Sequence, residues 1–385
     1  MNPLDKSKEE RATYAAAGVD IGAAERLVGR IKELVRSAGR PEVLAGVGPF
    51  AGLFHLGLPT GQAGQYREPV LVASADGVGT KLKLAALLGR YDTVGVDLVN
   101  HCVNDILTAG AEPLFFLDYL ASSDLGEEEK VAVVRGLVSA CRAAGCALIG
   151  GETADMPDLY APGDFDLVGF IVGVVERGCI IDGSTIQEGD VLLGLPSSGL
   201  HTNGYSLVRQ VFGIGKGGDP AAERATLDRY YPGLGVTLGE VLLIPHRCYY
   251  QELKPLLGHV KGMAHITGGG IPGNVARILP EGPSPGSSPE ANPPPAEGRS
   301  PSAGSGQSLA ARFDRGSWRV PPIFDLIQKT GRISDDEMYR VFNMGLGMVL
   351  VCSEEGASAV QQALPEAKAV GRVVRREGAE GVILG

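Results

Sequence analysis

The chain has 385 residues, too many for one ordinary hydrophobic core, so we expect two domains. Hydrophobic residues make up 44% and charged residues 21%, which is ordinary for a globular protein, and the formal net charge of −10 argues against a nucleic-acid partner. The first 11 residues lack the apolar core of a signal peptide, and no run of about 18 apolar residues could span a membrane.

Hydrophobic periodicity predicts helices alternating with strands in the first half of the chain. Leu27, Ile31, Leu34 and Val35 lie on one stripe of an expected helix at 23–37. The elements that follow are, in order, a strand at 70–75, a helix from Leu82, a helix at 97–109, a strand at 114–117, a helix at 127–144, and strands at 146–149 and 166–175. We place the end of the first domain at residue 175.

The second half of the chain repeats this alternation. Its expected elements are a strand at 191–195, a helix at 204–212, a strand with a glycine run at 265–270, a helix at 274–279 and a strand at 347–352. This order predicts an α/β or α+β fold with domains at 1–175 and 176–385. Gly, Pro and Ser fill 19 of the 27 positions in 282–308, so we expect a disordered surface insertion there.

The six cysteines are scattered along the chain without a C-x-x-C pair. We therefore expect neither a disulfide framework nor a zinc site, and a reducing cytoplasm is the compartment that fits.

The first candidate site is the segment from Asp76 to Lys81, between a predicted strand and a predicted helix. Gly77, Gly79 and Thr80 would present backbone N–H groups to an anion at the start of the helix. Asp76 would hold Mg²⁺, and Lys81 would meet a phosphate. The spacing matches neither a Walker loop nor G-x-G-x-x-G, so a simple tight turn is the alternative.

The predicted helix from Asp97 has one apolar face and one unusual polar face. A solvated face normally carries Lys, Glu and Arg, but this one carries short residues that are poor helix formers. No basic residue on the face neutralises its carboxylates, which Mg²⁺ with a polyphosphate would do. A solvated face is the alternative. The polar residues are Asp97, Asn100, His101, Asn104, Asp105 and Thr108.

Two further carboxylates follow predicted strands. Asp118 comes after the strand at 114–117, and Glu152 comes after Gly151 and the strand at 146–149. Ligands of α/β proteins bind at the carboxyl ends of strands. Asp118 and Glu152 would converge with Asp76 only if the three strands share one sheet, and each could otherwise cap a helix.

The loop at 197–204 lies between a predicted strand and a predicted helix and suits a phosphate or a ribose. His201 would act as a general acid or base near neutral pH, or would orient the loop by hydrogen bonding. The other candidate contacts in this loop are Ser197, Ser198, Gly199 and Asn203.

A second glycine-rich loop, Thr267-Gly268-Gly269-Gly270, precedes a predicted helix that begins at Asn274. Its backbone N–H groups would bind an anion in the same way. Asn343 lies just before a predicted strand and would supply an amide contact or form a bulge.

The segment from Asp105 to Pro113 reads D-x4-G-A-x-P and resembles the signature of a superfamily of ATP-using enzymes. Its members include aminoimidazole ribonucleotide synthetase, formylglycinamidine ribonucleotide synthetase, selenophosphate synthetase, thiamine-phosphate kinase and a hydrogenase maturation factor. The chain most resembles the first, phosphoribosylformylglycinamidine cyclo-ligase. The matching segments lie at 14–20, 40–43, 76–81, 150–156, 197–207, 267–270, 314–318 and 337–348. Asp155 and Asp158 depart from the usual Glu and Gly of that family.

This resemblance implies a two-domain fold and a homodimer whose N-terminal domains pair in a barrel-like interface. It implies ring closure of formylglycinamidine ribonucleotide to aminoimidazole ribonucleotide in purine synthesis, with ATP consumed through an iminophosphate. The implied Mg-ATP group is Asp76, Lys81, Asp97, Asp105 and Glu152. From the motifs themselves we place Gly77, Gly79, Thr80, Asn100, Asn104 and Gly151 beside the nucleotide. The implied substrate residues are Ser198, Asn203, Gly269 and Asn343, and from the loops themselves we add Ser197, Gly199, Thr267, Gly268 and Gly270. We assign catalysis to His201, Lys81 and Asp105.

Rival functions are weaker but remain open at this point. The first cysteine is Cys102, on the apolar stripe, where selenophosphate synthetase needs a reactive one near its N-terminus. The sequence ends in Ile-Leu-Gly, without the terminal cysteine of the hydrogenase factor. Thiamine-phosphate kinase, which shares the Mg-ATP half, is the strongest enzymatic alternative, and a non-catalytic nucleotide-binding protein is the other.

Overall fold

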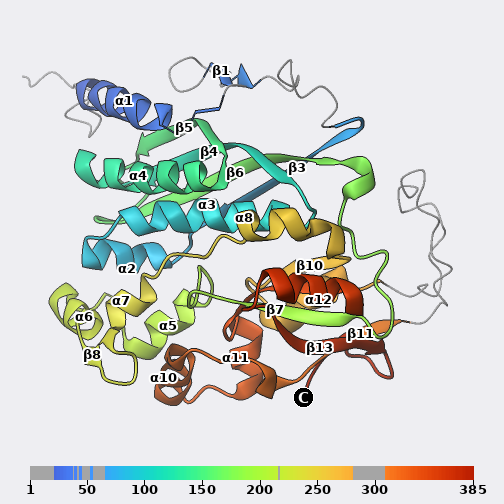
Figure 1. Cartoon of the computed structure of the whole chain (residues 1–385). Helices are drawn as coiled ribbons and strands as arrows, with labels where there is room; N and C mark the ends of the chain where they lie inside the picture. The colour runs from blue at the N-terminus through green and yellow to red at the C-terminus, as the bar shows by residue number, and fades with distance from the viewer. Residues whose placement is uncertain are drawn as a thin grey trace, which may run out of the picture.

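The computed structural model describes residues 21–37, 39–40, 43–45, 53–54, 66–215, 217–280 and 308–385. One four-stranded sheet uses residues 69–176 alone, and one six-stranded sheet uses residues 191–384 alone (Figure 1). We therefore place the domain boundary between these two sheets. The expected insertion at 282–308 lies, apart from Ser308, outside the described residues.

The first sheet has the strand order β3-β6-β4-β5. The β3–β6 and β6–β4 pairs are antiparallel, whereas β4 and β5 are parallel and need a crossover helix, which is α4. Helix α1 packs on α4, and a separate two-stranded ladder pairs β1 with β2. The bounds are β3 Pro69–Gly77, β6 Phe165–Glu176, β4 Glu112–Ser122, β5 Ala147–Asp155, α4 Glu127–Ala144, α1 Ile21–Arg36, β1 Val43–Ala45 and β2 Leu53–Phe54.

Helix α3 (Asp92–Leu107) follows α2 (Lys81–Leu88) and lies between the first sheet and the second domain (Figure 1). Two glycines let α3 approach α4 closely. A Cβ added at Gly95 would lie 2.3 Å from the carbonyl oxygen of Val133, and one at Gly136 would lie 2.1 Å from that of Asp92. Any larger side chain at either position would push the helices apart.

The second sheet has the strand order β10-β12-β7-β13-β11-β14, in which only the β11–β14 pair is parallel. Its second strand, β12, is buried along its whole length, as its continuous apolar sequence requires. The bounds are β10 Gly262–His265, β12 Leu346–Cys352, β7 Val191–Pro196, β13 Lys368–Arg375, β11 Leu309–Phe313 and β14 Val382–Leu384.

The remaining elements of the second domain are short helices and one two-stranded ladder. The helices are α5 Tyr205–Phe212, α6 Pro220–Leu227, α7 Leu238–Leu242, α8 Tyr250–Leu253, α9 Gly270–Val275, α10 Pro322–Gly331, α11 Asp335–Val341 and α12 Glu354–Ala363, and the ladder is β8 Tyr230–Tyr231 with β9 Val236–Thr237. Short 3₁₀ helices lie at Arg177–Cys179, Lys254–His259, Ala276–Ile278 and Arg315–Ser317. No helix among the described residues is long and apolar enough to cross a bilayer.

The predicted α/β class is confirmed, with differences at the ends of elements. Helix α4 has both of its predicted ends, but α3 begins at Asp92, five residues before the predicted start. Strand β4 continues to Ser122 because it pairs with a strand on each side, so Asp118 lies within it. Glu152 lies within β5 for the same reason of pairing.

A buried ion pair within the first domain anchors the second domain through further hydrogen bonds. Nζ of Lys81 donates to Oδ1 of Asp97 at 2.8 Å, and both side chains are fully inaccessible to solvent. The same Nζ donates to the carbonyl oxygens of His201 at 3.2 Å and Ile244 at 2.8 Å, which belong to the second domain. Three acceptors match the three donors of an ammonium group, so Lys81 is protonated here although burial lowers its pKa.

Lys81→Met should lower the free energy of unfolding by about 3–5 kcal/mol, because it leaves the Asp97 carboxylate buried without its partner. Lys81→Met combined with Asp97→Asn should recover part of that loss, since no unpaired charge remains. Urea denaturation measures both. Lys83→Met is the matched control, because Lys83 pairs with Asp164 near the surface and should cost about 1 kcal/mol or less. A Lys81→Met loss no larger than the Lys83→Met loss would contradict this account.

Candidate functional site

The polar face of α3 is buried against the second domain. Asp97 accepts the backbone N–H of His246 at 2.7 Å, and Asn100 donates to the carbonyl oxygen of His246 at 2.6 Å. Asn104 donates to the carbonyl oxygen of Arg247 at 2.7 Å and accepts the N–H of Tyr249 at 3.0 Å. These short side chains therefore dock the segment 246–249, a role that the sequence analysis did not consider. The neutralising charge for Asp97 comes from α2, not from α3 itself.

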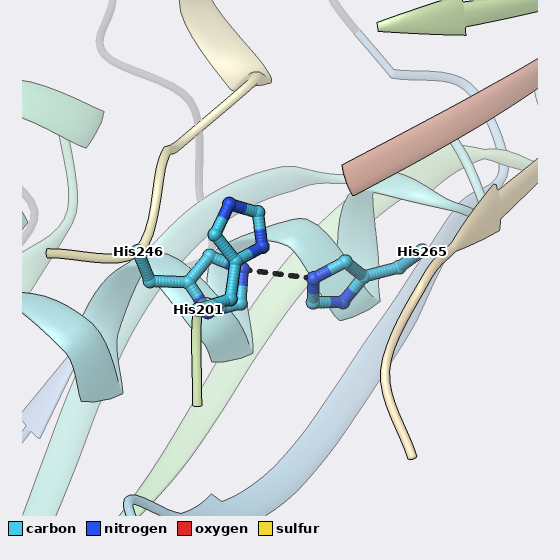
Figure 2. A group of neighbouring side chains, drawn as sticks. All are labelled: His201, His246 and His265. Atoms are coloured by element: carbon cyan, nitrogen blue, oxygen red, sulfur yellow. Dashed lines mark hydrogen bonds between the residues drawn. The ribbon is translucent and has the colours of Figure 1, made fainter. Parts of the chain in front are cut away.

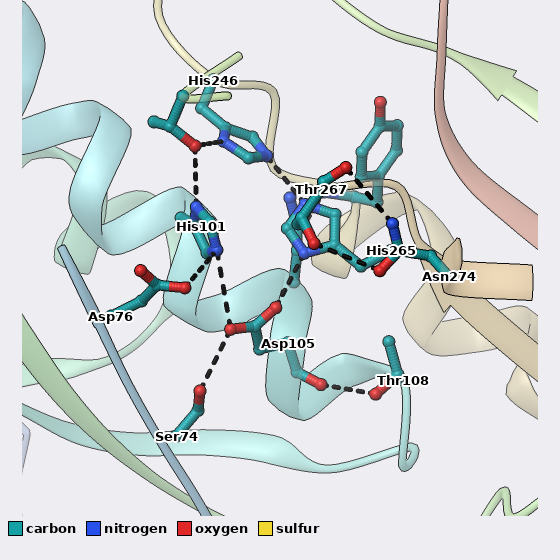
Figure 3. A network of polar contacts seen from close by, with 12 residues as sticks. Ser74, Asp76, His101, Asp105, Thr108, His246, His265, Thr267 and Asn274 are labelled. Atoms are coloured by element: carbon teal, nitrogen blue, oxygen red, sulfur yellow. Dashed lines mark hydrogen bonds and ion pairs between the residues drawn. The ribbon is translucent and has the colours of Figure 1, made fainter. Parts of the chain in front are cut away.

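Four of the six histidines of the chain gather where the domains meet (Figures 2 and 3). His101, His201, His246 and His265 are all buried. Nε2 of His246 lies 2.9 Å from Nε2 of His265, and the ring of His201 stacks on that of His246 with centroids 3.9 Å apart. We call these four residues the histidine cluster.

His101 links the acidic residues of the first domain to the loop at 197–204. Its Nε2 lies 2.8 Å from Oδ2 of Asp76 and 3.7 Å from Oδ2 of Asp105, and its Nδ1 lies 2.8 Å from Oγ1 of Thr202 (Figure 3). Oδ1 of Asp105 contacts Nδ1 of His265 at 2.8 Å. Asp76, Asp105 and two histidines thus form one connected polar group.

Burial and charge act in opposite directions on this group. Burial works against the protonated form of His101, but hydrogen bonding and charge from Asp76 and Asp105 outweigh it and raise the pKa of His101. Burial dominates for His201 and His246, whose pKa values lie well below the ordinary value for histidine. We conclude that His201 and His246 are neutral at physiological pH.

His201 has an unusual backbone conformation. It has a φ of 62°, unusual for a residue with a side chain, and its Nε2 accepts the N–H of Ser198 at 3.2 Å. Its Nδ1 is buried and has no hydrogen-bond partner among the described residues. Gly347 of β12 makes room for the ring, because a Cβ there would lie 2.5 Å from Cε1 of His201 and 2.0 Å from the hydroxyl of Tyr249.

Asparagine side chains hold the two glycine-rich loops of the second domain. Asn343 donates to the carbonyl oxygen of Gly199 at 2.8 Å and accepts the hydroxyl of Ser197 at 3.0 Å. Asn274 donates to the carbonyl oxygen of Gly270 at 2.8 Å and to that of Thr267 at 3.2 Å. The expected substrate residues of these loops therefore lie in a preformed backbone arrangement.

The two loops also adjoin each other. A Cβ added at Gly268 would lie 3.4 Å from Oδ1 of Asn203, which belongs to the loop at 197–204. In the loop at 267–270, Gly269 has a φ of 95°, which only glycine adopts without strain. In the loop at 197–204, Ser198 donates its hydroxyl to the carbonyl oxygen of Pro245 at 2.6 Å.

The acidic residues at the strand ends do not all converge. Asp76 pairs with Gly169, Gly169 with Asp118, and Asp118 with Gly151, so these residues form one row across the sheet. Residues directly opposite each other share a face, so Asp76 and Asp118 lie on one side. Glu152 comes next to Gly151 and therefore lies on the opposite side from Asp118.

The polar groups of the segment 76–81 bond mainly to other groups of the protein. The N–H of Gly77 donates to Oδ1 of Asp76 at 2.6 Å, and the hydroxyl of Thr80 lies 3.1 Å from that of Ser206. Gly79 has a φ of 69°, as a tight turn requires. Lys81 has all three donors occupied, so in this structure none remains for a phosphate.

Sequence reasoning did not single out His246, His265 or Thr202. His265 lies at the end of a buried strand just before the Thr267 loop, and that position is a usable signal. His246 lies in an irregular segment with no periodicity, so nothing local marks it.

The chain matches the family model "AIR synthase related protein, N-terminal domain" at residues 63–175 and "AIR synthase related protein, C-terminal domain" at 187–284 and 304–383. The chain therefore belongs to the AIR synthase family, whose members have this pair of domains. The C-terminal match leaves out residues 285–303, within the expected insertion.

Curated relatives show which enzymes of the AIR synthase family the chain resembles closely in sequence. The chain is 47% identical over 371 residues to a protein from Geobacillus thermodenitrificans, covering 95% of this chain and 96% of that one. It is 45% identical over 381 residues to one from Xanthomonas campestris, covering 97% and 100%. Both are named phosphoribosylformylglycinamidine cyclo-ligase, and the chain belongs to this enzyme family of purine biosynthesis.

Solved structures share the fold at much lower identity. Thiamine-monophosphate kinase from Stenotrophomonas maltophilia has a TM-score of 0.55 and 18% identity, covering 95% of this chain and 96% of that chain. Hydrogenase maturation protein HypE in complex with ATP has a TM-score of 0.57 and 17% identity, covering 94% and 91%. The identities favour the cyclo-ligase over the kinase that the sequence analysis kept as an alternative.

Asp118→Asn should change how stability depends on pH. Burial raises the pKa of Asp118 to about 7, so between about pH 4 and 7 the folded chain keeps a proton that the unfolded chain has lost. Stability conferred by the protonated carboxyl therefore falls as pH rises through that window, and it is constant above it. The Asn variant cannot ionise, so the melting temperature of wild type minus that of the variant should decrease from pH 4 to pH 7. A difference independent of pH would contradict this.

Proposed function

We propose that this enzyme closes the imidazole ring of formylglycinamidine ribonucleotide, with ATP converted to ADP and phosphate. The observation that carries the proposal is the connection through His101, which joins Asp76 of the first domain to Thr202 in the glycine-rich loop of the second. A site for two substrates needs such a junction, with a metal-binding half and a ribonucleotide-binding half in contact.

The chemistry follows from the weakness of an amide carbonyl as an electrophile. Phosphorylation of the amide oxygen by ATP gives an iminophosphate, the substrate's own nitrogen attacks that carbon, and phosphate leaves. No protein nucleophile is needed. The protein must position the two substrates and stabilise charge on the transferred phosphoryl group, which backbone N–H groups of glycine-rich loops do well.

Asp76 and Asp105 are the residues that would hold Mg²⁺. Their Oδ2 atoms converge on one point, 2.8 and 3.7 Å from Nε2 of His101, and carboxylate oxygens suit this ion. When bound, Mg²⁺ neutralises phosphate charge. His101 must turn away to admit it. Asp97 is committed to Lys81 and Glu152 lies on the other side of the sheet, so neither supports this site as the structure stands.

We assign the ribonucleotide to the two adjoining loops of the second domain. Their backbone is held by Asn343 and Asn274, so the N–H groups at 197–199 and 267–270 are positioned in advance. His201 is neutral and buried beside them, and its Nε2, which here accepts the N–H of Ser198, would accept the proton that ring closure releases from the attacking nitrogen once that bond opens. Lys81, Asn100 and Asn104 act by holding the domains together.

The purified enzyme should hydrolyse ATP only when formylglycinamidine ribonucleotide is present, with aminoimidazole ribonucleotide formed in equal amount. A coupled assay measures both products. Thiamine phosphate in place of the ribonucleotide tests the kinase, and turnover with it would contradict the proposal. ATP binding without turnover of either compound would favour a non-catalytic protein.

Asp105→Asn should lose most of the Mg-ATP-dependent turnover while the fold is kept, because an amide binds Mg²⁺ more weakly than a carboxylate. Steady-state kinetics at limiting Mg²⁺ provide the measurement. Asp92→Asn on the same helix is the control, since Asp92 is exposed and should leave the rate near wild type. Wild-type activity of Asp105→Asn at limiting Mg²⁺ would remove Asp105 from the metal site.

His201→Gln should lower kcat for ring closure by about 100-fold or more, the usual scale for a lost general acid or base. ATP binding should change little, because Asp76 and Asp105 are untouched. Steady-state kinetics across pH, with calorimetry for the nucleotide, separate the two effects. An unchanged kcat with a raised KM would make His201 a binding or loop residue.

We also propose a homodimer that acts in the cytoplasm. Leu71 and Phe170 are 54% and 41% exposed on the face of the first sheet that α3 does not cover, a surface suited to a second copy. All six cysteines are free thiols, as a reducing compartment favours. A sedimentation mass near 40.1 kDa, that of one chain, would contradict the dimer.

A further inference from the structure

Three members of the histidine cluster bring one ring nitrogen each into the same small region. One ring nitrogen from each of His201, His246 and His265 lies within 4.8 Å of the others, and all three side chains are buried (Figure 2). Imidazole is a preferred ligand of Zn²⁺ and of related late first-row cations, and three protein ligands with one open position is a common zinc arrangement.

Hydrogen bonds behind the rings orient two of the three. Nδ1 of His265 faces the carboxylate of Asp105 at 2.8 Å, and a carboxylate only accepts, so the hydrogen sits on Nδ1 and the lone pair on Nε2. Nδ1 of His246 faces the hydroxyl of Thr202 at 3.4 Å. A carboxylate behind the imidazole is a usual support of a metal-binding histidine, and a hydroxyl oxygen can accept the N–H of Nδ1 in the same way.

A cation bound between the three rings would remove two unfavourable features of the cluster. Nε2 of His246 and Nε2 of His265 lie 2.9 Å apart, so one of the two must carry a hydrogen and donate it to the other. Nδ1 of His201 is buried without a partner among the described residues, which costs free energy. Two nitrogens on one tetrahedral Zn²⁺ lie about 3.3 Å apart, so Nε2 of His246 and His265 need separate only slightly.

We propose that His201, His246 and His265 form a binding site for a zinc-class divalent cation, with Asp105 and Thr202 as supporting groups. The scattered cysteines gave no sign of such a site, because its ligands are histidines from three separate segments of the second domain. His201 must rotate out of its stack on His246 and release the N–H of Ser198, so that its hydrogen moves to Nε2 and the lone pair of Nδ1 faces the ion.

The site has a consequence that rests on the proposed function. A His201 nitrogen bound to a cation cannot take the proton released in ring closure, so cation binding and turnover exclude each other. Zn²⁺ should therefore inhibit the enzyme over the same concentration range in which it binds.

The test uses metal-free, full-length protein titrated with Zn²⁺ in excess Mg²⁺, without ATP or ribonucleotide. Mg²⁺ prefers oxygen ligands and does not compete for imidazole. Wild type should bind one Zn²⁺ per chain, and His246→Gln and His265→Gln should each weaken binding by about 100-fold or more. His259→Gln is the matched control, since His259 is exposed and outside the cluster, and it should bind as wild type does.

X-ray absorption of the zinc-loaded wild type keeps the proposal testable if a variant fails to fold. It should show three imidazole nitrogens at about 2.0–2.1 Å. A site with oxygen ligands only, or equal affinity in His246→Gln and wild type, would overturn the proposal. Because binding is measured without substrates, it is independent of the cyclisation assay. Zinc binding without inhibition would remove His201 from the ligands.

Discussion

The placement of one domain on the other depends on the buried pair of Lys81 and Asp97. Two charges removed from water stabilise a fold only when their remaining hydrogen-bonding capacity is met. Here the ammonium group meets it with the carbonyl oxygens of His201 and Ile244, and Oδ1 of the carboxylate accepts the N–H of His246. The pair therefore stabilises the interface only while the second domain stays docked.

Everything that we assign to catalysis lies along this interface. The ion pair fixes the segment that carries His246 and the loop that carries His201, and α3 carries Asp105 to the same place. The contacts of His101 with Asp76 and Thr202 then cross between the domains. A site assembled from both domains depends on how the domains dock, whereas a site within one domain would not.

The sequence predicted much of this fold because its signals are local. The glycines and caps that end α4 are adjacent in sequence, and the apolar runs of β6, β7 and β12 exceed what a solvated segment would carry. The polar face of α3 was recognised as unusual, but its role was not. Short polar side chains that bind a backbone and those that bind a metal look alike in sequence, and the partner segment lies about 145 residues away. The pairing of Lys81 with Asp97 could not be predicted either, because the two residues lie on different helices.

Hydrogen exchange at two backbone amides tests the interface most directly. The N–H groups of His246 and Tyr249 donate to side chains of α3 and not to the backbone of any helix or strand. Their protection from exchange therefore measures domain docking alone. In wild type they should exchange nearly as slowly as the amides of β12, and in Lys81→Met they should exchange much faster while β12 stays protected. Fast exchange of both amides in wild type, or no change in Lys81→Met, would show that the ion pair does not hold the domains together.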